Sequence, residues 1–320
     1  MQQYELLIQN KSSGQIYNIT NSVTSADWVT ERCDQPGKFT FQVLLSDDWQ
    51  MEPGDVVRFS MDGQLQFYGW VFTRADDRWN VSNVTCYDRL RYLKANASYA
   101  FYAQTAGDAV RQIAGDLQLT TGTIEDTGYK LPSLIEQNKS CFDIIQDAIE
   151  KTLNATGKLY VLYDDGEGLS LQEPANMVSD VVLGDQSLLT DYTYTSDIDK
   201  ETYNSIKLVK PNQETGRVDV YLTEDSANIG QWGLLQLYQQ VDDEQNEAQI
   251  KSMGAAMLAY YNRVLRSLKI SSLGVSGLRA GQMILIKIDG LALEQFVLIE
   301  KASHHYENGV HTMDLDLYEL

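Results

Sequence analysis

The stretch PGDVVRFSMDGQLQFYGWVFTRADD, residues 53–77, alternates apolar and polar residues on both sides of the pair Asp62-Gly63. Alternation with a period of two around an Asp-Gly pair predicts a β-hairpin. A second stretch, AGQMILIKIDGLALEQFVLIEKASH at residues 280–304, repeats this pattern around Asp289-Gly290. The chain therefore carries the same strand-turn-strand pattern near each end.

The two stretches align without a gap. Gly54 and Gly281 are 227 positions apart (281 − 54), and the two Asp-Gly turns have the same separation. Beyond the turns, the alignment places residues 70–72 opposite residues 297–299. Because alternation and Asp-Gly turns are common, two unrelated hairpins are the alternative explanation. The register shared by both strands favours two related β domains.

Length and composition are those of a globular protein with two or three domains. The 320 residues are 43% hydrophobic and 22% charged, and no apolar run approaches the roughly 18 residues that cross a bilayer. The first residues lack the basic and apolar regions of a secretory signal, so we expect assembly in a cytoplasm. The net charge of −20 disfavours stable nucleic-acid binding and anionic membranes.

The predicted fold class is α+β, dominated by strands. Residues 1–95 contain at least six short β segments, which predict a β-barrel-like domain. Residues 96–173 predict an inserted α+β domain, with helices at 105–119 and 140–157 followed by a hairpin. Residues 174–320 predict a second β-barrel-like domain. Its predicted features are turns at 212–216 and Asn308-Gly309 and one long helix at about 243–268.

That long helix carries an apolar stripe, which we expect to pack against a sheet or another subunit. The candidate packing residues are Ile250, Met253, Met257, Tyr260 and Val264, and the stripe also includes Tyr261 and Leu268.

Two related domains in one chain have a geometric consequence. If three chains close into a ring, six similar domains surround the axis, so a threefold assembly presents a quasi-sixfold face. Such a protein could join a hexameric partner to a trimeric one. We expect it to act as a symmetry adaptor.

The histidines and cysteines offer few options for chemistry. His304, His305 and His311 could bind zinc with Glu300 or Glu307, but adjacent strand residues point to opposite faces, so only one of the first two could join His311. The three cysteines, Cys33, Cys86 and Cys141, form neither a disulfide framework nor a metal pattern and are interpreted as buried small hydrophobic residues.

Catalytic motifs are not recognisable in the sequence. A nucleophilic pair of Cys141 and His304 would have to be assembled across domains. The acidic pairs Asp76-Asp77 and Asp164-Asp165 are interpreted as solvated turn residues. GxSxG, HExxH, P-loop and GxGxxG motifs are missing from the sequence, so we predict no enzyme activity, no cofactor and no metal.

Several longer segments resemble a known family. QFYGWVFTR (66–74), VTCYDRLRYLKANASYAFYAQTAGDAVRQIA (84–114), SDIDKETYNSIKLVKPN (196–212), GLLQLYQQVDDEQNEAQIKSMGAAML (233–258) and GLRAGQMILIKI (277–288) are similar to baseplate hub proteins of PBSX-like contractile phage tails, the XkdQ/YqbQ family. The resemblance extends over nearly the whole chain. It implies a structural hub, a homotrimer with a pseudo-hexameric ring, between the sixfold tail tube and the threefold central spike.

The resemblance also implies partners and a location. The partners would be the tail tube protein, the central spike protein, baseplate wedge and LysM-type tail proteins, and the tape-measure protein in the lumen. The location would be the baseplate of a prophage virion or an R-type bacteriocin particle. Two alternatives remain open: a tail-associated peptidoglycan hydrolase, and a carbohydrate-binding β protein suggested by 19 tyrosines and 5 tryptophans.

We expect the two matching hairpins to form the ring and dock the tube. The residues proposed for this role are Gly54, Asp55, Asp62, Gly63, Phe67, Gly69 and Trp70 in the first hairpin and Gly281, Asp289, Gly290, Phe296 and Leu298 in the second.

Overall fold

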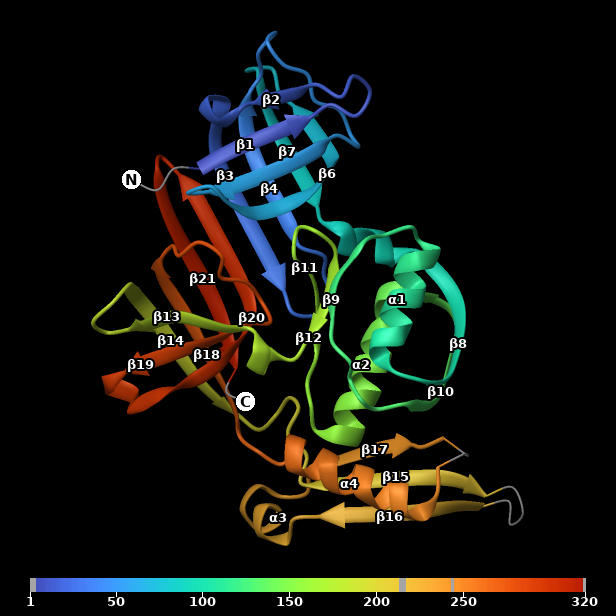
Figure 1. The fold of residues 1–320 in the computed structure, drawn as a ribbon. Helices are drawn as coiled ribbons and strands as arrows, with labels where there is room; N and C mark the ends of the chain where they lie inside the picture. Colours follow the sequence, from blue (N-terminus) through green and yellow to red (C-terminus); the bar gives the residue numbers. More distant parts are fainter. Residues whose placement is uncertain (1–3, 213–216, 243–244, 319–320) are drawn as a thin grey trace.

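The computed structural model describes residues 4–212, 217–242 and 245–318. It consists of one sheet of thirteen strands that is shared by an N-terminal and a C-terminal β unit, with two smaller units attached (Figure 1). The fold is therefore dominated by strands, as predicted. No helix within the described ranges combines the length and apolar character needed to cross a membrane.

The N-terminal β unit wraps around a core of aromatic and aliphatic side chains that includes Phe39, Phe59 and Phe67. Alternate residues of its strands are buried, as their period of two predicted. Its strands are β1 (Tyr4–Gln9), β2 (Ile16–Asn18), β3 (Val23–Glu31), β4 (Lys38–Leu44), β5 (Val56–Met61), β6 (Gln64–Asp76) and β7 (Val81–Tyr87), with 3-10 turns η1 (Thr20–Ser22) and η2 (Arg89–Lys94).

The C-terminal β unit has a separate core that is mostly aliphatic and includes Ile286, Ile299 and Leu315. The predicted Asn308-Gly309 turn joins its last two strands, with both residues at positive φ. Its strands are β13 (Val178–Gly184), β14 (Leu189–Asp197), β18 (Leu265–Leu273), β19 (Met283–Ile288), β20 (Leu293–Glu307) and β21 (Val310–Tyr318), with 3-10 turns η3 (Pro174–Asn176) and η4 (Asp289–Leu291).

The two β units repeat one topology. Five strands follow the order β3-β4-β7-β6-β5 in the first unit and β14-β18-β21-β20-β19 in the second. The pairing of β6 with β7 shifts register between Val71 and Thr73, and the pairing of β20 with β21 shifts register between Ile299 and Lys301. Two unrelated hairpins would not share strand order and the position of a bulge. The prediction of two related β domains is confirmed.

The first inserted unit follows the N-terminal β unit. The predicted helices are present as α1 (Ala106–Asp116), capped by Thr105, and α2 (Cys141–Thr156), which begins at the Ser140 cap and ends at Gly157 with φ of +72°. Together with short strands they enclose a third core. The strands are β8 (Asn96–Gln104), β9 (Thr121–Ile124), β10 (Leu131–Ser140), β11 (Val161–Asp164) and β12 (Leu169–Gln172).

The second inserted unit lies between β14 and β18, at the bottom of Figure 1, and was not foreseen as a separate body. It has a core of its own, formed by Ile206, Leu208, Val241, Ile250 and Met257. Its elements are β15 (Ser205–Asn212), β16 (Arg217–Glu224), α3 (Ser226–Trp232), β17 (Gln236–Gln240) and α4 (Glu247–Tyr261). Residues 213–216 of the predicted turn lie outside the described part of the chain.

The helix predicted at about 243–268 is α4, and its predicted end is wrong. The helix stops at Tyr261, and Leu268 lies on strand β18; the predicted first residues 243 and 244 lie outside the described ranges. Val264 and Leu268 are four residues apart, a spacing that suits a helical stripe and one face of a strand equally. The apolar stripe alone could not locate the boundary.

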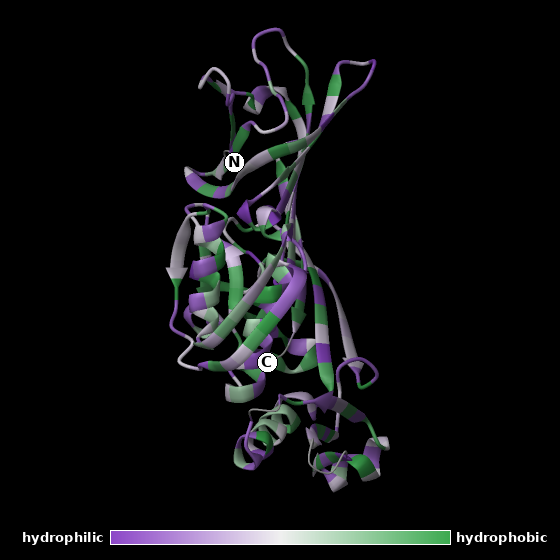
Figure 2. Cartoon of the chain, turned by 90° about the vertical axis from the view of Figure 1, so that its right-hand side faces the viewer, coloured by the Kyte–Doolittle hydropathy of each residue, from purple (hydrophilic) through white to green (hydrophobic). Residues whose placement is uncertain are grey.

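The β units meet along the pairing of β3 with β20. Seen from the side, the molecule is elongated, with apolar and polar residues alternating along the long strands that connect its upper and middle parts (Figure 2). The inserted units are attached beside and below this sheet (Figure 1).

Candidate assembly surfaces

The two predicted hairpins are β5–β6 and β19–β20, and they occupy equivalent places in the two β units. Val56 pairs with Trp70, whereas Met283 pairs with Leu298. Trp70 therefore corresponds to Leu298 and not to Val297, so the ungapped alignment is wrong by one residue beyond the turn. The reason is the turn of the second hairpin, which has four residues between Ile288 and Leu293 where the first has two between Met61 and Gln64; the register shift after Phe59 in the first hairpin offsets one of these two extra residues.

The twelve residues proposed for docking fall into exposed, half-buried and buried groups. Asp62, Gly63, Asp289 and Gly290 are exposed at the hairpin tips, and Phe296 is 48% exposed beside the second tip. Gly54 and Trp70 are half-buried. The buried members, which support their hairpins from within, are Asp55, Phe67, Gly69, Gly281 and Leu298.

Asp55 illustrates such a supporting role. Its carboxylate accepts hydrogen bonds from the backbone N–H of Lys11 at 2.9 Å and of Glu52 at 2.8 Å, and from Asn10 Nδ2 at 3.2 Å. A buried carboxylate with three donors holds the β1–β2 turn against the start of β5. All three hydrogen bonds of the Asp55 carboxylate are made within one chain, so they support the hairpin and do not contact a partner.

A cluster of rings fills the junction between β3 and β20. His304 stacks on Trp28 with ring centroids 5.1 Å apart, and its Nδ1 lies 2.9 Å from His311 Nε2. His304 and His311 thus lie on one face, as strand alternation predicted, while His305 lies on the other between Asp27 and Asp314. Burial lowers the pKa of His304 to about 3 and that of His311 to about 4. The pair is neutral and structural at pH 7.

The structure brings together neither the zinc site nor the Cys141–His304 nucleophilic pair that the sequence suggested for consideration. Within the described residues, no group of three His, Cys, Asp or Glu side chains is placed to hold a metal ion. Cys141 lies in the core of the first inserted unit, whereas His304 lies between the β units. Burial also raises the pKa of the Cys141 thiol, the opposite of what a nucleophile needs.

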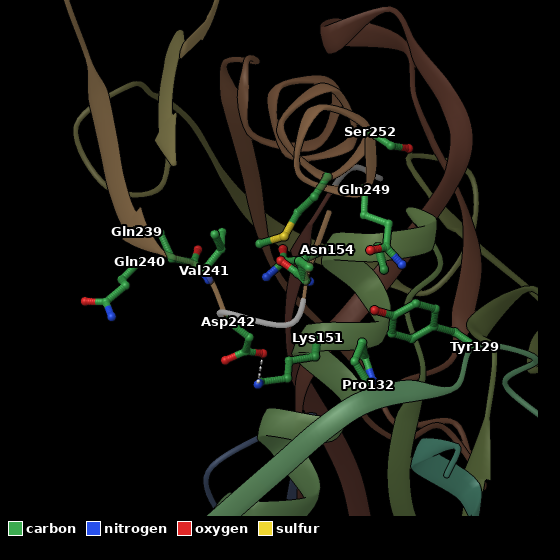
Figure 3. A pocket seen from close by; sticks show the side chains of 13 residues that line it. Tyr129, Pro132, Lys151, Asn154, Gln239, Gln240, Val241, Asp242, Gln249 and Ser252 are labelled. Carbon is green, nitrogen blue, oxygen red and sulfur yellow. Dashed lines mark hydrogen bonds and ion pairs between the residues drawn. The ribbon is translucent and has the colours of Figure 1, made fainter. Parts of the chain in front are cut away.

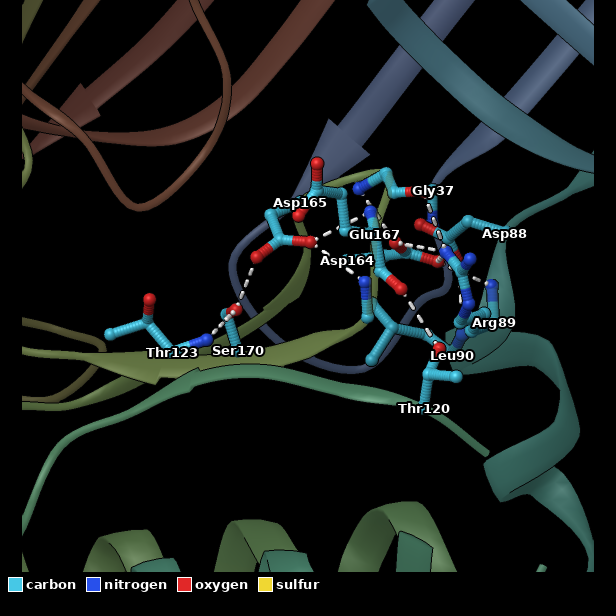
Figure 4. Close-up of polar contacts among 12 residues, drawn as sticks. Gly37, Asp88, Arg89, Leu90, Thr120, Thr123, Asp164, Asp165, Glu167 and Ser170 are labelled. Atoms are coloured by element: carbon cyan, nitrogen blue, oxygen red, sulfur yellow. Dashed lines mark hydrogen bonds and ion pairs between the residues drawn. The ribbon is translucent and has the colours of Figure 1, made fainter. Parts of the chain in front are cut away.

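A buried charged cluster joins three parts of the chain, and Figure 4 shows its contacts between the N-terminal β unit and the first inserted unit. Arg89 Nη1, at the end of the N-terminal β unit, lies 2.7 Å from Asp164 Oδ1 at the end of β11. Arg279, from the C-terminal β unit, donates to the carbonyl of Asp164 and covers the ring of Tyr163 with its guanidinium 4.4 Å from the centroid. Asp88 accepts from the N–H of Gly37 at 3.0 Å.

The interpretation of Asp164 as a solvated turn residue is wrong. It is 6% exposed, because the β11–β12 turn points into the seam between the units rather than into solvent. Burial raises the pKa of Asp164, and burial with the nearby Asp164 charge raises that of Asp88. Arg89 is 75 positions from Asp164 in the chain, and no local motif could have identified the pair.

A pocket of about 230 Å³ lies between the two inserted units (Figure 3). Its lining is rich in amides, including Asn154, Gln239 and Gln249, and Lys151 forms an ion pair with Asp242 at 3.2 Å across it. Pockets for small ligands are commonly larger, about 300–1,000 Å³. The geometry is that of a polar seam between α2 and the loop before α4.

Three of the five residues proposed for subunit packing on α4 belong to the core of its own unit. Ile250 and Met257 are buried against β15, and Met253 is partly buried there. Tyr260 packs on Tyr261 with centroids 4.9 Å apart, and Val264 lies beyond the helix. The apolar stripe is therefore the inner face of the second inserted unit.

Exposed aromatic residues do not gather into one platform. Trp79 (70% exposed), Tyr102 and Tyr238 lie on the β6–β7 turn, β8 and β17, which belong to three different units. A sugar-binding surface of stacked rings is therefore not formed by these side chains.

The sequence profile of the YQBQ-like family matches residues 26–318. The protein YqbQ of Bacillus subtilis (strain 168) is 29% identical over 297 residues, which cover 90% of each chain. The phage-like element PBSX protein XkdQ of the same strain is 29% identical over 274 residues, 85% of this chain and 83% of that protein.

Two crystal structures share the fold over nearly the full length. A tail protein from Neisseria meningitidis MC58 matches with a TM-score of 0.74 and 14% identity, covering 99% of this chain and 96% of that one. The 43 kDa tail protein of prophage MuSo2 from Shewanella oneidensis matches with a TM-score of 0.73 and 11% identity, covering 98% of both chains.

Proposed function

Because the chain belongs to the YQBQ-like family, we propose that it is a structural protein of a phage-type tail, the hub of a contractile baseplate. In this role three copies form a ring in which the N-terminal and C-terminal β units alternate. The ring presents six similar β units to a hexameric tail tube and three chains to a central spike. The proposal assigns it no catalysis.

One observation carries the proposal: the duplication of five strands with the same order and the same bulge within one chain. Duplicated units related by strand topology can occupy alternate positions of one ring, which a threefold assembly requires if it is to match six copies of another protein. The similarity to the PBSX protein XkdQ and the fold shared with two tail proteins support the assignment to a tail.

The hairpin tips are the proposed contacts with the tube. Asp62-Gly63 and Asp289-Gly290 lie at equivalent tips of the two units, so a ring would present six of them. Among the described residues the inserted units differ from each other, and neither has a counterpart in the other half of the repeat, so they suit threefold partners such as the spike, the wedge and LysM-type proteins. The lumen of the ring would pass the tape-measure protein.

The mass of the assembly tests this proposal. Native mass spectrometry of the full chain, alone and with the tail tube protein of the same particle, should give three times the chain mass of 36.1 kDa for the hub. Tube binding should weaken when Asp62 and Asp289 are both replaced by lysine, while the hub mass stays unchanged. A hub that remains monomeric with the tube protein present, or forms a ring of another number, would overturn the proposal.

A further inference from the structure

The junction inside the chain is a complete strand pairing. Strand β20 pairs with β3 from Lys301 opposite Glu31 to Glu307 opposite Ser25. Two side-chain contacts reinforce it: Lys301 Nζ lies 2.8 Å from Glu31 Oε1, and His305 Nδ1 lies 2.6 Å from Asp27 Oδ1. This junction joins the N-terminal unit, through β3, to the C-terminal unit, through β20.

Each of the two strands in this junction has a counterpart in the other β unit. The counterpart of β3 is β14, and the counterpart of β20 is β6. Both β3 and β14 shift register against their neighbouring strand at the same place, between Val23 and Ser25 and between Leu189 and Asp191, which fixes the correspondence residue by residue.

These two counterpart edges have no strand partner among the described residues. Strand β14 pairs only with β18, and its residues 193–196 are exposed. On that edge β6 is bonded to β5 as far as Trp70, and Val71 bonds to Gly54 and Asp55 just before β5, which leaves residues 72–76 without a strand partner there. A long edge with unsatisfied backbone groups is a template for another strand. Each chain therefore exposes two strand edges, on β14 and on β6, that correspond to the two strands paired in its own β3–β20 junction.

We propose that β14 of one copy pairs with the distal part of β6 of the next copy, repeating between chains the β3–β20 junction that exists within the chain. This inference rests on the proposed ring and names its contact. Transfer of the internal register places Ala75 opposite Thr195, with Thr73 opposite Asp197 and Asp76 opposite Tyr194.

The transferred register is electrostatically compatible. Arg74 falls opposite Ser196, and Asp77 falls opposite Thr193, so no two like charges face each other directly across these strands. The contact joins different surfaces of the two copies, so it continues from chain to chain, and it closes into the proposed ring when each contact turns the next chain by one third of a full rotation. Closure would remove both exposed edges.

A cysteine pair tests the junction and its register. In a Cys33→Ser background, Ala75→Cys with Thr195→Cys should form a disulfide between copies, because residues directly opposite on antiparallel strands lie within bridging distance. Both positions are exposed, so the substitutions leave the cores intact. Mild oxidation should give covalent trimers on a non-reducing gel. The control, Ala75→Cys with Thr193→Cys, is offset by two residues on the same face and should stay uncrosslinked.

Hydrogen exchange provides a second measurement that needs no substitution. Amides of residues 73–76 and 192–196 should exchange more slowly in the assembled form than in the dilute monomer. Amides of the other outer strand, β2 (Ile16–Asn18), should be unchanged.

The outcomes separate the two proposals. A particle with the mass of three chains that lacks both the 75–195 crosslink and protection of β14 would overturn this junction while leaving the ring intact. Equal crosslinking of the offset control would also overturn the register. A chain that stays monomeric with its tube partner would overturn the ring and the junction together.

Discussion

Gly54 and Gly281 make the same hydrogen bond in the two copies of one hairpin: Gly54 N–H donates to the carbonyl of Val71 and Gly281 N–H to that of Ile299, each at 2.8 Å. Both have a positive φ, +95° and +91°. Their surroundings differ. A Cβ on Gly54 would meet no atom within 4 Å, whereas one on Gly281 would lie 2.6 Å from Val161 Cγ1 in the first inserted unit.

Alanine at these two positions should therefore have unequal effects. Gly54→Ala should lower the free energy of unfolding by about 1 kcal/mol, since the left-handed backbone disfavours a side chain. Gly281→Ala should lower it by a further 1–3 kcal/mol or so, because the new methyl group overpacks against Val161. Urea unfolding measures both.

Val161→Ala supplies the control for this comparison. It should restore part of the stability lost by Gly281→Ala and none of that lost by Gly54→Ala. Additive losses in the Gly281→Ala/Val161→Ala double variant would contradict the contact.

The Arg89–Asp164 pair should be a strong determinant of how the units hold together. Arg89→Met leaves the Asp164 carboxylate buried without its cation, so the free energy of unfolding should fall by about 3–5 kcal/mol. Arg89→Met with Asp164→Leu should recover much of that loss, because neither member of the pair is then left buried without the other. Lys251→Ala removes the exposed pair with Glu247 and should leave the free energy of unfolding almost unchanged, because solvent screens that pair. Similar losses from both single variants would argue against the buried cluster.

The sequence predicted features that depend on local patterns. Alternation located the strands of both hairpins, and the caps Thr105 and Ser140 located the two helices of the first inserted unit. Repetition of the hairpin pattern was sufficient to predict related β units. Each of these signals lies within one turn, one cap or one strand.

Features that depend on distant contacts could not be predicted in this way. The burial of Asp164 follows from the approach of Arg89 and Arg279, which come from different units. The exposure of the docking residues depended on which face of each strand met the core, so Phe67 and Leu298 proved to be buried. The end of α4 was misplaced because a four-residue spacing fits both a helix and a strand.

Helix α4 should contribute to folding of the second inserted unit and not to the ring. Met257 is 1% exposed in a core with Ile206 and Leu208, so Met257→Ala should lower the free energy of unfolding by about 2–5 kcal/mol. The native mass of the assembly should not change. Ala259→Ser, on the exposed side of the same helix, is the control and should change neither quantity much. Loss of the trimer with unchanged stability would instead place α4 at a subunit contact.

The buried histidine pair should make the chain less stable in mild acid. The Leu278 carbonyl accepts from His304 Nε2–H at 2.7 Å, so Nδ1 of the same ring is free to accept from His311 Nε2–H. The pKa values of about 3 for His304 and about 4 for His311 lie below the value of about 6.5 expected in the unfolded chain. Between about pH 6.5 and pH 4 the unfolded chain binds protons that the folded chain does not.

Stability should accordingly be complete above about pH 6.5 and fall as the pH drops toward 4, by up to about 1.4 kcal/mol per pH unit for each histidine. The raised pKa values of Asp88 and Asp164 act in the opposite direction, so a comparison of variants is needed. His304→Gln keeps a donor for Leu278 and removes one titrating group, so its urea midpoint should fall less steeply over this range. Trp28→Phe, which removes a stacked ring without a titrating group, should lower the midpoint at every pH and keep the wild-type slope. Parallel curves for His304→Gln and the wild type would show that this histidine is not held neutral by the fold.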